Sequence, residues 1–341
     1  MSRFSYYCEI LRKVRPLRAA PKAWNYLKYR CLPLKAVVSV RRYTPQIGAL
    51  FLTKRCNLDC SYCCAANAIR QGRRGNWRES EANLERVKRI FAHPLFVNCL
   101  LVDLMGGEPL LVADLDRIVA HLTERGHMTN TSTNGVLLAE RVADLKQAGI
   151  SRINVSLYDD TQTVMHRDLR KINHVFPVHT SLVLLRSVVE SQPEKLLELA
   201  RFVREAGCRS LRFWMYRPIG AEPKLQEVIA ETDPAYLEFR RRVEEAIPGF
   251  CLWPKGVTRG VVRKRCAQLW QRVGCDALGN MAICCGTDSS LQGPTSNLFD
   301  ASPDAVFNHP TLVAMRRQLL DPGEDAPGIC KNCNLLDDPG W

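Results

Sequence analysis

The sequence predicts an α/β fold in which six parallel strands alternate with helices and a smaller cysteine-rich region follows. Strand-like apolar runs recur between helix-like segments from residue 47 to residue 248. The chain has 341 residues, of which 46% are hydrophobic and 24% charged, values typical of a globular protein with one large domain or one large and one small domain. We therefore expect residues 1–46 to form an extension, 47–248 the main domain, and 249–341 a second, smaller domain.

The order of the elements indicates how the strands pair. Strand-like runs lie at 47–52, 99–104, 128–133, 153–157, 180–185 and 211–215. Helix-like segments lie at 81–91, 113–124, 139–147, 194–205 and 234–246, whereas the crossover 159–178 reads poorly as a helix. Strands joined by helical crossovers pair in parallel with right-handed connections. Chemistry in such folds lies at the carboxyl ends of the strands, where the loops converge.

The N-terminal extension is strongly basic. Residues 1–46 contain eleven Lys or Arg and one acid, Glu9, so they carry +10 of the chain's +13 net charge. Trp24, Leu27 and Cys31 fall at helical spacing beside Lys28, which predicts a short amphipathic helix. This extension fits an anionic membrane surface, a phosphate-bearing substrate or an acidic partner, or it packs across the barrel as a solvated arm. Nucleic acid is disfavoured as a partner because no reader motif accompanies the charge.

Composition also indicates the compartment. No apolar run approaches the roughly 20 residues of a membrane-spanning helix, and the basic N-terminus lacks an apolar core followed by a cleavage site. We expect a cytoplasmic protein, with peripheral membrane contact through residues 1–46 as an alternative. In such a chain the fifteen cysteines favour metal ligation or catalysis over disulfides.

Three cysteines follow the first strand in one short loop. Cys56, Cys60 and Cys63 have Cys-x3-Cys-x2-Cys spacing, so their thiolates can converge on one inorganic group. A 4Fe-4S cluster needs four ligands, and three cysteines leave one iron open for an outside ligand. This pattern predicts a cluster that binds a substrate or cofactor directly. A zinc knuckle, an ordinary ferredoxin loop and a chance arrangement are the alternatives.

The loop CNLDCSYC, with Tyr62 before its last cysteine, resembles the signature of radical S-adenosylmethionine (SAM) enzymes. The resemblance implies a partial (β/α)6 barrel and a SAM-binding 4Fe-4S cluster. It also implies that the open iron chelates SAM and that SAM is cleaved to a 5'-deoxyadenosyl radical, which abstracts hydrogen from an unactivated C–H bond. Such an enzyme needs a reducing partner such as flavodoxin or ferredoxin.

The same resemblance implies a set of SAM-binding residues at successive strand ends. Gly106, Gly107 and Glu108, within Gly-Gly-Glu-Pro, resemble the motif that approaches the SAM amino group. In the family the third and fourth strands end in residues that face the SAM ribose or carboxylate, and a downstream arginine pairs with that carboxylate. Arg167 replaces the family's usual Asp in that downstream segment, and turn or capping chemistry is the alternative for each polar residue. The corresponding residues here are Ser132, Asn134, Ser156 and Arg170.

A second group of cysteines occupies the C-terminal region. Gly279 lies in the turn of a predicted hairpin at 272–285. The spacing resembles the shortened SPASM, or twitch, domain, which implies a C-terminal iron-sulfur domain of a hairpin plus helix with an auxiliary 4Fe-4S cluster. A structural zinc site is the alternative. Alternation along a strand allows only one of two adjacent cysteines to face the cluster, so Cys285 can replace Cys284. The implied ligands are Cys266, Cys284, Cys330 and Cys333.

Two further cysteines are candidates for chemistry. Cys251 and Cys275 lie in the region expected to cover the barrel mouth, where a thiol can donate hydrogen to a substrate radical, although burial is the commoner fate of a free cysteine. By resemblance to twitch-bearing dehydrogenases, the main hypothesis is oxidation of a small molecule through the auxiliary cluster. Epimerisation, maturation of a ribosomally made peptide and a non-catalytic iron-sulfur or zinc scaffold are the alternatives. The sequence does not separate a phosphorylated, sugar-like or lipid-head-group substrate.

Overall fold

The computed structural model describes most of the chain. The described residues are 16–30, 39–40, 43–60, 63, 77–157, 162–218, 224–253, 266–284, 290–321 and 327–330. Tyr62, Cys285 and Cys333 lie outside these ranges.

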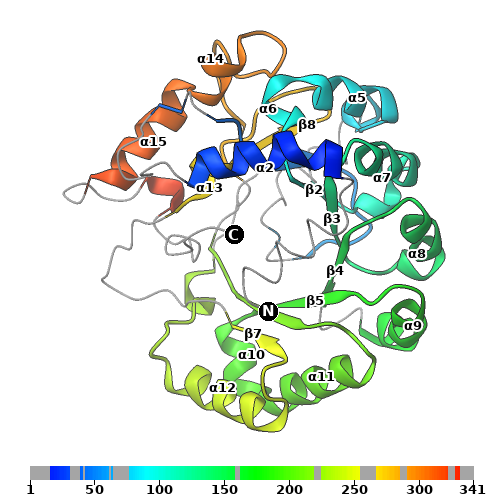
Figure 1. Cartoon of the computed structure of the whole chain (residues 1–341). Coiled ribbons are helices and arrows are strands. Elements are labelled where there is room, and N and C mark those ends of the chain that lie inside the picture. The colour runs from blue at the N-terminus through cyan, green and yellow to red at the C-terminus, as the bar shows by residue number, and fades with distance from the viewer. Residues whose placement is uncertain are drawn as a thin grey trace.

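A single parallel sheet forms the centre of the molecule (Figure 1). Its strand order in the described residues is β7-β6-β5-β4-β3-β2-β1-β8, and every pairing is parallel. The six predicted strands are confirmed, each to within two residues at either end, and the α/β partial-barrel prediction is therefore correct. The strands are β1 (Ile47–Phe51), β2 (Leu101–Met105), β3 (Met128–Thr133), β4 (Arg152–Leu157), β5 (His179–Leu184), β6 (Leu211–Met215), β7 (Cys251–Leu252) and β8 (Arg272–Asp276).

Helices cover the outside of this curved sheet, as Figure 1 shows. The crossovers contain α5 (Leu84–Ala92), α6 (Pro94–Val97), α7 (Leu115–Glu124), α8 (Leu138–Gln147), α9 (Gln162–Val175), α10 (Arg186–Ser191), α11 (Pro193–Glu205) and α12 (Pro234–Ala246). Among the described residues the remaining helical elements are α2 (Pro16–Arg30), α4 (Trp77–Ser80), α13 (Gln268–Gln271), α14 (Pro303–Phe307), α15 (Pro310–Leu320) and the short 3-10 turns η2 (Pro109–Leu111), η3 (Leu225–Glu227) and η4 (Gly328–Cys330). None of the described helices is both long and apolar enough to cross a membrane.

The crossover 159–178, which reads poorly as a helix in the sequence, does contain one, because α9 occupies most of it. Leu169, Ile172 and Asn173 are buried together, so the inward face of α9 includes a polar residue that weakens the apolar periodicity. The Asn173 amide donates to the backbone oxygens of Leu169 (2.9 Å) and Ala206 (3.0 Å) and accepts from the amide of Val178 (2.9 Å). A buried side chain satisfied in this way costs the helix little.

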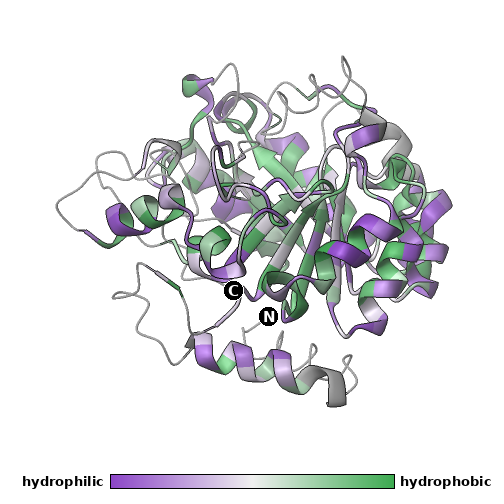
Figure 2. Ribbon diagram, turned by 90° about the horizontal axis from the view of Figure 1, so that it is seen from above, coloured by the Kyte–Doolittle hydropathy of each residue, from purple (hydrophilic) through white to green (hydrophobic). Residues whose placement is uncertain are grey.

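The two faces of the sheet differ in polarity because successive strand residues point to opposite sides. Residues such as Leu50, Ile153 and Phe213 are fully buried in the apolar core against the helices. Their neighbours in sequence point to the opposite side, called here the inner face. Figure 2 shows hydrophobic residues in the central strands and both hydrophobic and hydrophilic residues along the surrounding helices.

An ion pair on the inner face links two strands that are not neighbours. Arg272 of β8 donates from Nη1 to the Asp103 carboxylate of β2 at 2.5 Å, across β1. Asn130 of β3 donates to the other Asp103 oxygen at 2.8 Å. About a tenth of each charged side chain is exposed. The pair therefore ties β8, which was not foreseen as part of this sheet, to the predicted strands.

The Asp103–Arg272 pair gives a prediction about stability. Asp103→Ala leaves the Arg272 guanidinium buried without its counter-charge, so we expect the free energy of unfolding to fall by about 3–5 kcal/mol. Arg117→Ala is the control, because Arg117 is 63% exposed beside Asp114 and its loss should cost under about 1 kcal/mol. Urea unfolding followed by circular dichroism measures both. Equal effects of the two substitutions would contradict this account of the sheet.

Candidate functional site

The predicted cysteine loop begins directly after β1, at the carboxyl end of the sheet. Cys56, Cys60 and Cys63 are each half-buried, and the Cys63 amide donates to the Cys60 oxygen at 3.2 Å. The Leu58 amide donates to the Cys56 sulfur at 3.5 Å, a contact that suits a thiolate. No group of three Cys, His, Asp or Glu in the described part of the chain is already gathered as a metal site. The donors themselves, three half-buried thiols on one loop, fit the ligand set of an iron-sulfur cluster.

The backbone of this loop is held by the segment that follows β2. The Leu52 amide donates to the Met105 oxygen at 2.7 Å, which continues the β1–β2 ladder beyond the strands. Gly107 then donates to Thr53 (2.8 Å) and Glu108 donates to Arg55 (2.7 Å). The residue next to Cys56 is thus fixed by backbone hydrogen bonds.

Gly106 and Gly107 make this approach sterically possible. A Cβ on Gly107 would lie 1.9 Å from the Arg55 backbone oxygen, and one on Gly106 would lie 2.5 Å from the Thr53 oxygen. Gly106 also has φ 137°, which side-chain-bearing residues rarely adopt. The two glycines therefore let the segment after β2 contact the cysteine loop. Their predicted contact with SAM stays a prediction.

Glu108 joins the ends of β2 and β3. It is 1% exposed, and its carboxylate accepts from the Leu110 amide (3.0 Å), the Thr133 hydroxyl (2.7 Å) and the Asn134 amide (2.8 Å). Burial raises the pKa of Glu108, while these three hydrogen bonds act in the opposite direction. All three donors belong to the protein, so Glu108 has a positioning role. It holds the ends of β2 and β3 together beside the cysteine loop, and these residues are called here the loop frame.

Asn134 closes a ring of contacts around the cysteine loop. Its side-chain amide donates to the Asn57 side-chain oxygen at 2.7 Å, and its own oxygen accepts from the Val136 amide at 3.1 Å. Asn57 lies between Cys56 and Cys60. Hydrogen bonds thus connect the cysteine loop to the end of β2, the end of β2 to the end of β3, and the end of β3 back to the loop. Two residues predicted for the site, Glu108 and Asn134, make these connections.

An ion pair that the sequence reasoning missed supports the outer side of this loop. Arg55 donates from Nε and Nη2 to the two Glu81 oxygens at 2.8 and 2.9 Å, and from Nη2 to the Leu111 backbone oxygen at 2.7 Å. The Thr53 hydroxyl donates to the same carboxylate at 2.8 Å. The one signal in the sequence is an arginine directly before Cys56, which does not identify Glu81 as its partner.

The other predicted SAM-binding residues divide into two groups. Ser132 and Ser156 lie on the inner face near the carboxyl ends of β3 and β4, where Ser132 is exposed and Ser156 half-buried. Arg170 lies on the exposed side of α9, with its guanidinium 5.9 Å from the ring centre of Phe202 on α11, so it belongs to the outer helical layer. Tyr62 lies outside the described residues.

The expected position of Cys251 and Cys275 over the barrel mouth is corrected by the structure. Cys251 of β7 pairs with Leu211, the first residue of β6, at the amino end of the sheet. Cys275 of β8 pairs with Leu50 and is fully buried. Both thiols belong to the apolar core on the helix side, where burial raises the pKa of Cys251 to about 12 and raises that of Cys275 strongly. This placement separates them from the inner face.

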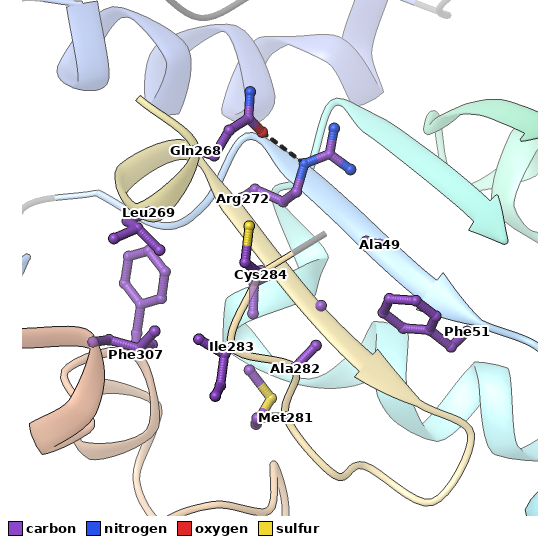
Figure 3. A pocket seen from close by; sticks show the side chains of 13 residues that line it. Ala49, Phe51, Gln268, Leu269, Arg272, Met281, Ala282, Ile283, Cys284 and Phe307 are labelled. Carbon is purple, nitrogen blue, oxygen red and sulfur yellow. Dashed lines mark hydrogen bonds between the residues drawn. The ribbon is translucent and has the colours of Figure 1, made fainter. Parts of the chain in front are cut away.

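The predicted C-terminal hairpin is confirmed, with Gly279 in its turn at φ 87° and the Asp276 amide donating to the Asn280 oxygen at 3.0 Å. Its first strand is β8, which pairs in parallel with β1. Its returning segment carries Cys284 beside a pocket that encloses about 440 Å³, part of it open to solvent (Figure 3). Cys266 and Cys330 are half-buried, and Cys333 and Cys285 are outside the described residues.

A cluster of cations lies on the inner face at the amino ends of β4, β5 and β6, away from the cysteine loop. Arg152 and Arg212 alternate with buried helix-side neighbours on β4 and β6, and His179 lies on β5 between these strands. Burial first, and then the charges of Arg152, Arg209 and Arg212, lower the pKa of His179 to about 3. The buried Nε of Arg152 has no hydrogen-bond partner among the described residues. The inner face therefore offers fixed positive charge beside a neutral imidazole.

Comparison with known proteins identifies one family and several relatives of similar sequence. Residues 50–218 match the Radical SAM superfamily. A probable GTP 3',8-cyclase of Aeropyrum pernix is 33% identical over 164 residues, which cover 44% of this chain and 46% of that protein. The GTP 3',8-cyclase of Paenarthrobacter nicotinovorans is 30% identical over 208 residues, covering 53% of this chain and 57% of that protein. The chain thus spans about half the length of these curated relatives.

Solved structures share the fold over a longer stretch. Streptococcus suis SuiB bound to S-adenosylmethionine superposes with a TM-score of 0.60 at 17% identity, covering 85% of this chain and 72% of SuiB. Native anSMEcpe with bound AdoMet superposes with a TM-score of 0.56 at 15% identity, covering 84% of this chain and 86% of that one. At such identities the similarity concerns the fold alone.

The glycine contact gives a prediction about the loop. In Gly107→Ala the new Cβ would lie 1.9 Å from the Arg55 backbone oxygen, so the cysteine loop must shift. We therefore expect this variant to lose most of its bound iron. Gly249→Ala is the control, because its Cβ meets nothing within 4 Å and at φ 68° it costs only about 1–2 kcal/mol of backbone strain. Iron and sulfide analysis after anaerobic reconstitution compares the two. Full iron content in Gly107→Ala would show that the close approach is dispensable.

Proposed function

The chain belongs to the radical SAM superfamily, and from that premise we propose that it cleaves SAM reductively and abstracts hydrogen from a C–H bond of an anionic small molecule. The observation that carries this proposal is the half-buried cysteine loop held against Gly106–Gly107–Glu108 at the carboxyl end of a parallel sheet. When bound, a 4Fe-4S cluster and SAM supply the one-electron cleavage that yields a 5'-deoxyadenosyl radical.

The residues of the loop frame have separable tasks in this proposal. Cys56, Cys60 and Cys63 hold the cluster and leave one coordination site for SAM. The hydrogen bonds from Gly107 and Glu108 to Thr53 and Arg55 fix the loop so that the site keeps one geometry. The polar groups at the ends of β3 and β4, together with Tyr62, are the remaining proposed SAM-binding residues. Arg170 loses support for this task, because it lies in the outer helical layer against Phe202.

The inner face supports an anionic substrate. Arg152 and Arg212 provide two guanidinium groups on this face near the amino ends of β4 and β6, so they would hold the distal end of a substrate that extends along the face from the cysteine loop. A planar guanidinium suits phosphate or carboxylate oxygens. The buried Nε of Arg152 without a partner is a donor that a ligand can satisfy. The curated relatives are named for a reaction of GTP, which is itself a phosphorylated small molecule. A phosphorylated compound is therefore the substrate class that we propose.

The outcome of the reaction has two candidates. In the first, Cys266, Cys284, Cys330 and Cys333 would hold an auxiliary cluster, which would supply an acceptor for the second electron and so give net oxidation of the substrate. Flavodoxin or ferredoxin would be the reducing partner. The second is cyclisation of a nucleotide, favoured by the names of the curated relatives. Epimerisation with Cys251 or Cys275 as the hydrogen donor loses support, because both thiols are buried on the helix side of the sheet.

Removing the loop cysteines tests the proposed function. Each of Cys56→Ala, Cys60→Ala and Cys63→Ala should abolish 5'-deoxyadenosine formation from SAM under dithionite, because each removes one of three cluster ligands. Cys208→Ala is the control, since Cys208 is buried away from the loop and should leave the product yield nearly unchanged. The readout is chromatography of the nucleoside with iron analysis on the same samples. Unchanged 5'-deoxyadenosine in all three variants would refute the proposal.

The inner-face arginines give a test of the substrate class. We expect Arg152→Gln and Arg212→Gln each to weaken binding of GTP, used as a phosphorylated probe, by about 10- to 100-fold, since a hydrogen bond to a charged group contributes about 1.5–3 kcal/mol. Because the pKa of His179 is lowered to about 3, His179 stays neutral from pH 5 to 8, and its protonation should not change this affinity.

Arg209→Gln is the matched control, because Arg209 lies near His179 but is exposed before β6. Equilibrium dialysis against GTP and against inorganic pyrophosphate measures the affinities. A wild-type protein that binds neither probe, or arginine variants that bind as tightly as Arg209→Gln, would contradict an anionic substrate at this position.

A further inference from the structure

Helix α2 lies at the end of the barrel opposite the cysteine loop. Asn25 exchanges two hydrogen bonds with the backbone of Thr44, which precedes β1 (3.0 and 2.9 Å). Lys22 donates to the Val97 oxygen before β2 (2.7 Å), and Tyr29 donates to the Gln271 side chain before β8 (3.1 Å). All three contacts involve residues just before strands, so α2 covers the amino ends of β1, β2 and β8. Figure 1 shows it as the dark blue helix across this part of the sheet.

The orientation of α2 reverses the ordinary amphipathic pattern, in which apolar residues face the protein. The polar or partly polar residues Lys22, Asn25 and Tyr29 are only 4–5% exposed. The large apolar residues Trp24 and Leu27 are 61% and 51% exposed. The sequence correctly predicted a helix here, but its apolar stripe points into solvent.

Directional polar contacts fix this orientation. Burial lowers the pKa of Lys22 to about 8, and a carbonyl oxygen accepts from its ammonium group. Tyr29 also packs edge-on against Tyr43 with ring centres 5.3 Å apart, and Tyr43 donates to the Trp270 oxygen at 2.9 Å. To turn its apolar stripe inward, α2 would have to break these bonds and leave buried polar groups without partners, which is costly.

The outward face of α2, defined here as Ala20, Pro21, Trp24, Leu27 and Lys28, combines apolar side chains with positive charge. The Lys28 ammonium lies 5.8 Å from the centre of the Trp24 ring. The helix sequence PLRAAPKAWNYLKYR contains four basic residues, of which Lys22 faces the protein, and no acid, within an extension of net charge +10.

We propose that the outward face of α2 binds reversibly to the surface of an anionic lipid bilayer. Tryptophan favours the headgroup region of bilayers, and each Lys or Arg near an anionic surface contributes about 1 kcal/mol. Two large apolar side chains are too few for a stable protein interface, which buries about 800 Å² on each partner, but are enough to insert into the headgroup boundary. The charge and the size of the patch thus favour a lipid surface over a protein partner.

This orientation leaves the proposed site accessible. Since α2 covers the amino ends of the strands and the cysteine loop follows the carboxyl end of β1, a protein adsorbed through α2 turns its site away from the lipid. Substrate and reductant can then approach from solution while the protein is bound. The inference does not depend on the proposed reaction, because binding is measured without turnover.

Vesicle sedimentation of the full chain tests this inference. We expect binding to phosphatidylcholine vesicles that contain phosphatidylglycerol and at least about tenfold weaker binding to phosphatidylcholine alone. Trp24→Ser/Leu27→Ser should weaken binding to the anionic vesicles by about tenfold or more, because two apolar side chains no longer insert. Lys28→Glu, made as a separate variant, should also weaken binding to the anionic vesicles and make that binding less sensitive to salt.

The matched control is Leu225→Ser/Leu237→Ser, which removes two other exposed leucines, 63% and 49% exposed, and should bind like wild type. Circular dichroism confirms that all variants are folded. Failure of the wild type to bind anionic vesicles, or equal binding by the Trp24/Leu27 and Leu225/Leu237 variants, would overturn the proposal. A concentration-dependent dimer in ultracentrifugation that is lost in Trp24→Ser/Leu27→Ser would assign the face to a second copy instead, and would also overturn it.

Discussion

The backbone contact between the loop after β1 and the segment after β2 is the constraint on which the site depends. Gly107 and Glu108 donate to Thr53 and Arg55, and the first of these bonds requires a residue without a Cβ. The Glu108 carboxylate then fixes the end of β3 by accepting hydrogen bonds from Thr133 and Asn134, and it also accepts one from Leu110. A loop of three cysteines is a weak cluster site unless its backbone is fixed, because mobile ligands lose conformational entropy on binding. The fold therefore meets the conformational cost of ordering residues 53–57, the part of this loop that these hydrogen bonds hold.

Alternation along the strands divides the chemistry of the molecule. The helix side of the sheet holds the apolar core, which also contains Cys251 and Cys275. The inner face holds the Asp103–Arg272 pair and the cations Arg152 and Arg212. A thiol on the helix side is one residue away in sequence from the inner face, yet it is separated from it by the sheet itself. Side-chain parity thus decides which residues can meet a substrate.

The two ends of the barrel are organised by different interactions. At the carboxyl end, backbone hydrogen bonds and a buried carboxylate hold a reactive loop. At the amino end, buried polar side chains of α2 hold a helix whose apolar residues face outward. In each arrangement, hydrogen-bonded polar groups hold a feature that is unfavourable by itself: a loop with half-buried thiols at one end and exposed apolar side chains at the other. Conversely, the features that these groups support, exposed tryptophan and half-buried thiols, are those available to outside ligands.

The sequence by itself determined the six strands, the alternation with helices, the cysteine loop and the turn at Gly279, because each depends on residues close together in the chain. Only the tertiary structure decided the pairing of β8 with β1, the Arg55–Glu81 and Asp103–Arg272 pairs, and the side on which Cys275 lies. It also revealed α9, whose inward Asn173 interrupts the apolar period, and the reversed orientation of α2. These features depend on contacts between distant segments. Local periodicity specifies that a residue alternates with its neighbours, but not which side the helices will cover.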